Sequence, residues 1–370
     1  MASLRPILRV LASGATASLL VVGSVQLRAP VRTDAAAALD LPLLRWLLQA
    51  LGGGTPAEPT TTTTATTPTT TTAPVAPPAT PLPVSRVLFD SNRTGNYEIF
   101  MVDRNGSGTQ QLTNDRRYDS WWPKLSPDRT RLIFYRTPAG IHDLDYAKAS
   151  MWSLNMQTKV PTLLLAAGAY GWKMHGHAEW SPDGSRLTMF GGRDNPEIFV
   201  TDALGRKPVQ VTRRGGPNLD PSWSPDGQSL VFVGCPQPFC GFSQLEVYRT
   251  PVTGGSETRL TFDGLRDHDP YYSPDGRTIA WLRETSAPMR WGLSAMAPDG
   301  SAQRTVIDDG GINSKPGWSP DSSTIFFHRL PIGGQGFGLY SIQPDGTGLA
   351  PIPGAVPSGY NNEYPVNSSY

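Results

Sequence analysis

Cysteine is nearly absent from this sequence: its 370 residues include two, Cys235 and Cys240. They lie in a proline-rich stretch, Cys-Pro-Gln-Pro-Phe-Cys-Gly. In an exported protein such a close pair is most simply a disulfide that pins its loop, and two free thiols are the alternative. A metal site formed by the pair is disfavoured, because two thiolates alone do not complete a tetrahedral ligand set.

An excess of charge of either sign is also missing. Lys and Arg number 32 and Asp and Glu 31, for a formal net charge of +1. No basic face is implied, so nucleic acid is not an expected partner. The sequence has no Gly-x-Ser-x-Gly elbow, no His-Glu-x-x-His and no phosphate-binding glycine loop followed by Lys. It therefore predicts no catalytic residue and no cofactor, with a divalent cation as the one open possibility.

The first 83 residues have almost no globular pattern. Arg5 and Arg9 precede an apolar stretch over 10–27, and small residues follow at 35–38. This order predicts a signal peptide, or an uncleaved signal anchor, over 1–38, and hence an extracellular or envelope-associated protein. Apolar residues at helical spacing, ended by three glycines, predict a short helix over 39–54.

Residues 55–83 are of low complexity, with runs of Thr interrupted by Pro. Such a segment has little apolar surface to bury and stays extended. Ser/Thr-rich tracts with Pro in exported proteins are often O-glycosylated stalks, and a plain linker is the alternative. Contact with a membrane is expected only through the N-terminal segment.

From residue 84 onward the sequence repeats a Ser-Pro-Asp turn at intervals of 43 to 55 residues, the period of a four-stranded propeller blade. Each turn is preceded by Pro or Ala three residues earlier and, in most repeats, by an aromatic residue directly before the serine. A short apolar strand follows it. The turn serines are Ser126, Ser181, Ser224, Ser273 and Ser319.

The two ends of the repeat are complementary. The chain enters it at a second strand, near residues 86–89, and ends with Pro365 and Ser368 at the offset of a first strand. We therefore predict an all-β fold, a six-bladed, monomeric β-propeller over 84–370, closed by the C-terminal strand, which leaves no open sheet edge. The predicted blades are 84–118 plus 358–370, 119–173, 174–216, 217–266, 267–312 and 313–357.

The aspartates of the turns have a structural explanation. Pro fixes the second turn position, Asp caps local N–H groups and Gly takes a positive φ. Arg129 and Ser322 replace this Gly at modest strain. The aromatic residues before the turns are predicted to be wedges between neighbouring sheets. Asp143 and Asp145, in the longest insertion, are expected to be solvated.

The residues that differ between repeats are the candidates for function. The segments that enter each first strand meet at one mouth of the central channel, and they carry three of the five histidines of the chain. The predicted ligand-binding residues at this mouth are Trp121, Trp122, His175, His177, Asp220, His268, Asp269, Lys315 and Glu363.

A metal site is a second interpretation of the same mouth. His175 and His177 are two residues apart, which predicts a shared strand face, and His268 falls in an analogous segment. Imidazoles and carboxylates that converge could bind a divalent ion. The simplest alternative is that polar residues gather at a wet channel mouth and bond to neighbouring blades.

The repeat resembles the TolB-type propeller. The resemblance rests on Trp-Ser-Pro-Asp-Gly, on Ser-Asn-Arg-Thr-Gly-Asn-Tyr-Glu-Ile-Phe at 91–100, on Gly-Arg-Asp-Asn-Pro-Glu-Ile-Phe at 192–199 and on the Leu-Thr pairs. It implies a six-bladed propeller outside the cytoplasm, like a docking protein that binds peptides and lipoproteins at its channel mouth. The small N-terminal α/β domain of that protein is not seen here. Some related propellers are metal-dependent polysaccharide lyases that use channel histidines.

Two functions of different classes follow. The first is a non-enzymatic binding or scaffold module whose channel mouth takes a peptide, an envelope protein or a glycan. The second is a metal-assisted hydrolase or lyase that acts on a cell-wall or environmental polymer. Fold by itself does not decide between them.

Overall fold

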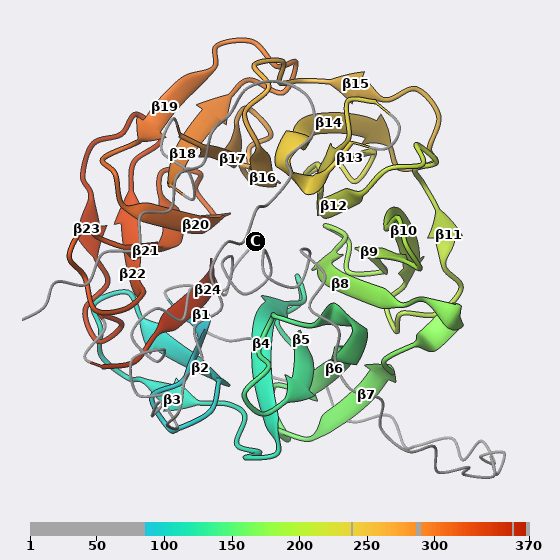
Figure 1. The fold of residues 1–370 in the computed structure, drawn as a ribbon. Coiled ribbons are helices and arrows are strands. Elements are labelled where there is room, and N and C mark those ends of the chain that lie inside the picture. The colour runs from blue at the N-terminus through green and yellow to red at the C-terminus, as the bar shows by residue number, and fades with distance from the viewer. Residues whose placement is uncertain (1–85, 238–239, 286–289, 357–358, 368–370) are drawn as a thin grey trace, which may run out of the picture. The chain divides into compact units, whose positions relative to one another are not determined.

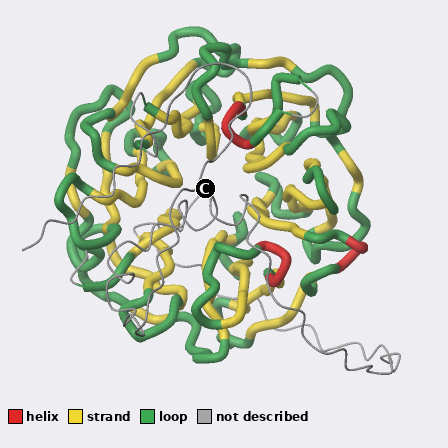
Figure 2. The backbone as a smooth tube through the Cα atoms, viewed as in Figure 1, coloured by secondary structure: helices red, strands yellow, loops and turns green. Residues whose placement is uncertain are grey.

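Among the residues that the structure describes, almost every regular element of the computed structural model is a β-strand, with three single turns of 3₁₀ helix (Figure 1, Figure 2). The structure describes residues 86–367 except 238–239, 286–289 and 357–358. The predicted signal segment (1–38), helix (39–54) and stalk (55–83) lie outside the described residues. Within the described part, no helix has the length and apolar character needed to cross a membrane.

The strands follow one another in short antiparallel meanders. Their bounds are β1 (Arg86–Ser91), β2 (Glu98–Asp103), β3 (Gln110–Gln111), β4 (Tyr118–Leu125), β5 (Arg131–Pro138), β6 (Ser150–Asn155), β7 (Pro161–Leu165), β8 (Met174–Trp180), β9 (Arg186–Gly192), β10 (Glu197–Asp202), β11 (Val209–Gln210), β12 (Asn218–Trp223), β13 (Ser229–Gly234), β14 (Glu246–Pro251), β15 (Thr258–Arg259), β16 (Asp267–Tyr272), β17 (Ile279–Glu284), β18 (Trp291–Met296), β19 (Arg304–Ile307), β20 (Ile312–Trp318), β21 (Ile325–Leu330), β22 (Gly338–Ile342), β23 (Ala350–Pro351) and β24 (Asn362–Asn367). The 3₁₀ turns are Tyr146–Lys148, Ala169–Gly171 and Phe242–Gln244.

Strand pairing groups the described strands into units of four. Four sheets have four strands each, and a larger sheet consists of β16–β19 and β20–β23 joined by one parallel bridge, Trp291 to Ile312. We number these units as blades: blade 1 is β24 with β1–β3, and blades 2 to 6 follow in chain order from β4. In Figure 1 the blades surround a common centre, with the first strand of each innermost. The propeller class predicted from the repeat is confirmed.

The C-terminal strand closes the ring, as predicted. β24 pairs antiparallel with β1, so that Val366 lies opposite Leu88 and Glu363 opposite Asp90. In the sequence, β24 is thus separated from the other three strands of blade 1 by the rest of the domain, although it pairs with them in space. Because this pairing satisfies the edge of β1, the ring has no open edge at the junction.

The apolar core is divided among the junctions between blades. The described residues form six buried clusters, and each cluster takes its members mainly from two neighbouring blades. The cluster of Val87, Phe89, Phe326 and Leu339 joins blade 1 to blade 6. Burial of these faces against one another is the main favourable term for such a ring.

The repeated turn has the structural role predicted for it. Ser181 donates from Oγ to Asp183 Oδ1 at 2.5 Å, and Asp183 accepts the backbone N–H of Ser185 at 3.0 Å. The same Ser–Asp contact recurs in the other turns, at Asp128, Asp226, Asp275 and Asp321. Arg129 and Ser322 take positive φ values of 58° and 59° where the other turns have Gly.

The aromatic residues before the turns are wedges, as expected. The indole N–H of Trp180 donates to the carbonyl of Lys124 in the preceding blade at 3.1 Å. In the same way, the indole N–H of Trp223 donates to the backbone carbonyl of Glu179 at 3.2 Å. That of Trp318 donates to the backbone carbonyl of Tyr271 at 3.1 Å. Cys235 and Cys240 form the predicted disulfide, which closes the loop before Phe242.

Deletion of residues 362–370 removes β24 and should leave the edge of β1 unpaired. We expect a lower melting temperature and concentration-dependent association on size-exclusion chromatography, because an exposed strand edge pairs with other chains. A chain that ends at Asn367 keeps all of β24 and is the matched control. Equal melting temperatures and elution volumes for the two truncated chains would contradict the closure.

Candidate functional site

Each innermost strand is interrupted by a β-bulge at the same place. In β12, Leu219 pairs with Val233 and Ser222 with Val231, so two residues, Asp220 and Pro221, lie opposite one. The other five innermost strands shift register in the same way. Proline follows the first bulge residue in all blades but one, which costs no ladder hydrogen bond because a bulge position is already unpaired.

The first residue of every bulge adopts a left-handed backbone, with φ between 49° and 55°. None of these residues is glycine, although the conformation favours glycine. Such strain persists where the surrounding structure enforces it, and it gathers at functional sites. The six bulge residues, four positions before each turn serine or its equivalent, are Trp122, His177, Asp220, Asp269, Lys315 and Tyr364.

A cavity of about 540 Å³ lies among the innermost strands. Five of the six bulge residues line it, Trp122 being the exception. Loops from blades 2, 4 and 6 add Leu144, Tyr146, Phe242 and Phe337, and the strands add further apolar residues, among them Phe190, Leu219, Leu282, Trp291 and Ile312. A volume of this size is typical of sites for small molecules or peptide side chains.

A buried ion pair crosses the ring two residues beyond the bulge residues. Lys124 Nζ lies 2.6 Å from Glu179 Oε1 and donates to the Tyr271 hydroxyl at 3.1 Å. Tyr271 in turn donates to Glu179 at 2.6 Å. These residues come from β4, β8 and β16, and β4 and β16 face each other across the centre of Figure 1. None of the three lines the cavity.

Asp220 is held between two histidines. One carboxylate oxygen contacts His177 Nδ1, and the other lies 2.9 Å from His268 Nδ1. Burial opposes ionisation, but the contacts with His177, His268 and Lys315 hold the pKa of Asp220 well below its usual range. Asp220 is therefore an ionised carboxylate whose two oxygens already have partners.

His177 is held by partners on both ring nitrogens. The Tyr146 hydroxyl lies 2.6 Å from Nε2, and burial raises the pKa of that hydroxyl well above its ordinary value. Tyr146 thus donates to Nε2, which leaves Nδ1–H to donate to Asp220. Burial and the nearby Lys315 lower the pKa of His177, so the ring is neutral at neutral pH. Trp122 stacks beneath it, with ring centroids 3.9 Å apart.

Ligand atoms of His177, Asp220 and Asp269 lie within 4.8 Å of one another, which is close enough for one metal ion. The surroundings of this group are nevertheless those of an ion-pair network. Lys315 donates from Nζ to Asp269 at 2.7 Å. A divalent cation at this point would have to displace the lysine ammonium and break the contact between His177 and Asp220, so the residues present fit a metal poorly.

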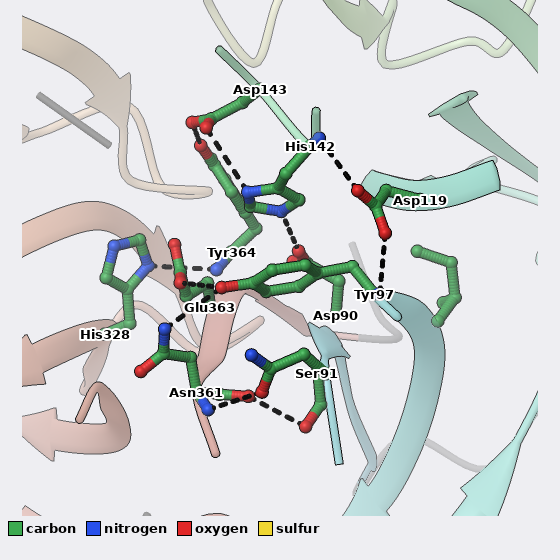
Figure 3. Close-up of polar contacts among 12 residues, drawn as sticks. Asp90, Ser91, Tyr97, Asp119, His142, Asp143, His328, Asn361, Glu363 and Tyr364 are labelled. Atoms are coloured by element: carbon green, nitrogen blue, oxygen red, sulfur yellow. Dashed lines mark hydrogen bonds and ion pairs between the residues drawn. The ribbon is translucent and has the colours of Figure 1, made fainter. Parts of the chain in front are cut away.

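A second group of ionisable residues joins the ring closure to the cavity wall. We call Asp90, Tyr97, His142, Asp143, Glu363 and Tyr364 the closure cluster (Figure 3). His142 Nε2 lies 2.7 Å from Asp90, and Nδ1 lies 3.2 Å from Asp143. Tyr97 stacks on the His142 ring and donates to Glu363 at 2.8 Å, and Tyr364 contacts Asp143 through its hydroxyl.

Burial sets the protonation of this cluster. It raises the pKa of Glu363 to about 8 and that of Asp90 to about 6. Burial also opposes charge on His142, but Asp143 and Asp90 outweigh it and raise the His142 pKa well above its ordinary value. His142 in turn lowers the pKa of Asp143 to about 2, against the effect of burial. At neutral pH His142 is therefore a charged imidazolium between the carboxylates of Asp90 and Asp143, and the nearby Glu363 is protonated.

The structure brings together some of the predicted mouth residues and separates others. His177, Asp220, His268, Asp269, Lys315 and Glu363 line the cavity. Trp121 and Trp122 do not: both are buried, and Trp121 packs against Tyr135 and Tyr146.

His175 does not line the cavity, and the prediction that it shares a face with His177 is wrong. The bulge after Gly176 ends the regular alternation before His177. His175 instead lies between blades 2 and 3, near Tyr135 and the carbonyl of Ala166, and burial lowers its pKa to about 4. The predicted metal set of His175, His177 and His268 is therefore not assembled.

The expectation for Asp143 is also wrong. Its side chain is 10% exposed and contacts His142 and Tyr364, whereas a solvated side chain was expected. The reason is Asp119, whose carboxylate accepts the backbone N–H groups of Gly140 and His142 and so draws the insertion over the cavity. Asp145 is partly exposed and caps Ala147.

Several cavity residues carried no signal in the sequence. Tyr146 and Leu144 come from the blade 2 insertion, and Trp291 begins β18. Arg266 directly precedes the Asp267-His-Asp segment, which is the one hint that it belongs to the same mouth.

Comparison with known proteins decides the family. The family model of the TolB beta propeller domain matches residues 166–358, just over half of the chain. The chain belongs to the TolB β-propeller domain family. A TolB homolog of Chlorobium luteolum (strain DSM 273 / BCRC 81028 / 2530) is 32% identical over 162 residues, 42% of this chain and 34% of that protein. The TolB homolog of Chlorobium chlorochromatii (strain CaD3) is 29% identical over 149 residues, which cover 40% of this chain and 31% of that protein.

The chain thus spans about a third of the length of these TolB relatives. Among solved structures, TolB from Acinetobacter baumannii superposes with a TM-score of 0.63 at 18% identity, over 77% of this chain and 67% of that one. An oligogalacturonate lyase in complex with manganese superposes with a TM-score of 0.50 at 13% identity, over 73% of this chain and 74% of that one. At these identities the likeness to the solved structures shows the fold alone.

Substitution of Glu363 by Gln should change how stability depends on pH. Folding raises the Glu363 pKa from 4.5 to about 8, so its contribution is fully present below about pH 4.5 and is lost as the pH rises through 8. Gln mimics the protonated form at every pH. We expect the unfolding free energy of E363Q relative to the wild type to increase by roughly 2–4 kcal/mol from pH 5 to pH 8.5. Urea denaturation of both proteins at both pH values measures this change. A difference in unfolding free energy that does not vary with pH would contradict the raised pKa of Glu363.

Proposed function

We propose that this protein is an exported, non-enzymatic binding module of the cell envelope whose cavity holds a segment of a partner protein. The observation that carries the proposal is the convergence of five strained bulge residues on one cavity of about 540 Å³. A TolB-type propeller outside the cytoplasm is the family context that supports it.

The shape of the cavity supports a bound segment. The ion pair of Lys124 and Glu179 crosses the ring, so we expect it to obstruct passage of a ligand through the central channel. Apolar side chains such as Leu219, Phe242 and Phe337 line the cavity together with the charged residues of the bulges. An apolar wall with a few fixed polar groups is typical of sites where orientation and specificity are set by those groups.

The chemistry of the polar groups favours binding over catalysis. Both nitrogens of His177 have partners, and the carboxylates of Asp220 and Asp269 are paired with His268 and Lys315. A general base needs a free acceptor within reach of a substrate proton. These groups are arranged to hold one another in place, which suits a rigid recognition surface.

A metal-assisted hydrolase or lyase is the second candidate, and the ligand atoms of His177, Asp220 and Asp269 within 4.8 Å favour it. Melting curves with and without Mn²⁺, Zn²⁺ and Ca²⁺ discriminate the two. The binding proposal predicts no change in melting temperature. A rise of several degrees that disappears in Asp269→Asn would favour the enzyme instead.

A photo-crosslinking residue placed at Leu144, on the cavity wall, should capture an envelope protein in cells that produce the chain. The same residue at Leu349, which is 41% exposed on the outside of blade 6, is the matched control. Ser314→Trp narrows the cavity and should reduce the adduct at position 144 by about tenfold or more, because steric exclusion removes the bound segment.

Three results would contradict the proposal: equal adducts at both positions, an adduct that Ser314→Trp does not reduce, or an adduct with a glycan. The last would assign the cavity to a glycan ligand. Retention of the wild-type melting temperature by Ser314→Trp excludes unfolding as the cause of a lost adduct.

A further inference from the structure

Arg266 is a buried cation in the cavity wall. It directly precedes β16, is 7% exposed and lines the cavity. Its guanidinium carbon lies 4.7 Å from the ring centroid of Trp291, which also lines the cavity and is 3% exposed. The indole ring therefore fixes the plane of the guanidinium by stacking.

Arg266 forms no ion pair with another residue that the structure describes. Within the described residues no carboxylate lies within 4.0 Å of its guanidinium, and its Nε is buried without a hydrogen-bond partner. The indole Nε1 of Trp291 beside it is also buried without one. Glu284 attracts Arg266 most and Asp220 next, but neither lies within 4.0 Å of its guanidinium, and the two oxygens of Asp220 are engaged by His177 and His268.

A comparable arginine elsewhere in the ring is fully paired. Arg329 is 6% exposed, contacts both carboxylate oxygens of Asp309 and donates to Asn313 at 2.8 Å. Burial of a charge without a partner is costly, whereas a paired and hydrogen-bonded charge is tolerated. Arg136, outside the cavity, is also buried with an unpaired Nε, but it lies 3.9 Å from Asp115, whereas no described carboxylate lies within 4.0 Å of Arg266.

We propose that Arg266 is the anchor for a carboxylate of the ligand, with Trp291 as the positioning residue that holds the guanidinium plane. The proposal rests on the binding function proposed above and names the chemistry that the cavity recognises. A carboxylate accepts two parallel hydrogen bonds from a guanidinium. Leu282 and Ile312, which pack with Trp291, provide an apolar surface for the adjoining part of the ligand.

A small probe tests the anchor directly. 3-Phenylpropionate has one carboxylate and an apolar body, and 3-phenylpropionamide has the same shape without the charge. We expect the wild type to bind the carboxylate at least about tenfold more tightly than the amide by isothermal titration calorimetry, because a hydrogen bond to a charged group contributes more than a neutral one. Arg266→Gln should abolish this preference, and Arg266→Lys should keep part of it.

Arg186→Gln is the matched control. Arg186 stacks on Trp223 at 4.8 Å, much as Arg266 stacks on Trp291, but neither residue lines the cavity. This variant should keep the full preference for the carboxylate. Arg266→Gln should melt no lower than the wild type, since it removes an unpaired buried charge. A clear fall in melting temperature would instead indicate a structural role and contradict the anchor.

The source of the carboxylate is settled by further ligands. We compare the binding of three ligands: acetyl-Ala-Ala-Phe with a free C-terminal carboxylate, the C-terminal amide of this peptide, and digalacturonate. The first represents the end of a peptide and the last a uronic acid. Preferential binding of either acid, lost in Arg266→Gln, supports the anchor and names the source. Equal binding of 3-phenylpropionate and its amide, or no saturable binding of the carboxylates, overturns it. The crosslink from Leu144 reports on the proposed binding function separately, so the two failures can be told apart.

Discussion

One extra residue in each innermost strand, held in the left-handed conformation, is the constraint on which the cavity depends. A regular strand would alternate its side chains between the two faces of its own sheet, where neighbouring blades cover them. The bulge breaks that alternation, and in five of the six blades its first side chain lines the cavity. Non-glycine residues in this conformation cost about 1–3 kcal/mol each, which the packing between blades offsets.

The same geometry separates the centre of the ring into two levels. At the bulge, His177, Asp220, Asp269 and Lys315 form a paired set that faces the cavity. Two residues later along the strands, Lys124, Glu179 and Tyr271 meet across the ring beneath it. These contacts obstruct the central channel at that level, next to a cavity that is lined by apolar side chains and by the paired charges of the bulges.

Ring closure and the cavity share residues. Glu363 and Tyr364 belong to β24, which locks the ring, and both line the cavity. Their partners in the closure cluster include His142 and Asp143 from the insertion of blade 2, which lies over the same mouth (Figure 3). The stability of the junction and the electrostatics of the mouth are therefore set by one group of side chains.

The fold could be predicted because the repeated turn has a local cause: Ser181 and Asp183 satisfy each other and the backbone between them. The closing strand followed from the phase of Pro365 and Ser368. The site could be predicted only in part. A bulge cannot be recognised from alternation, so His175 was placed on the wrong face. Arg266 was missed because a missing ion partner becomes visible only when long-range neighbours are known.

The central claim is that ligands contact the cavity wall and that the aromatic wedges between blades are scaffold. Fluorine NMR of the protein labelled with 5-fluorotryptophan tests it in one titration with 3-phenylpropionate. The resonance of Trp291 should shift saturably, while those of the wedge residues Trp180, Trp223 and Trp318 stay in place. Shifts at the wedge residues with an unchanged Trp291 resonance would contradict the account.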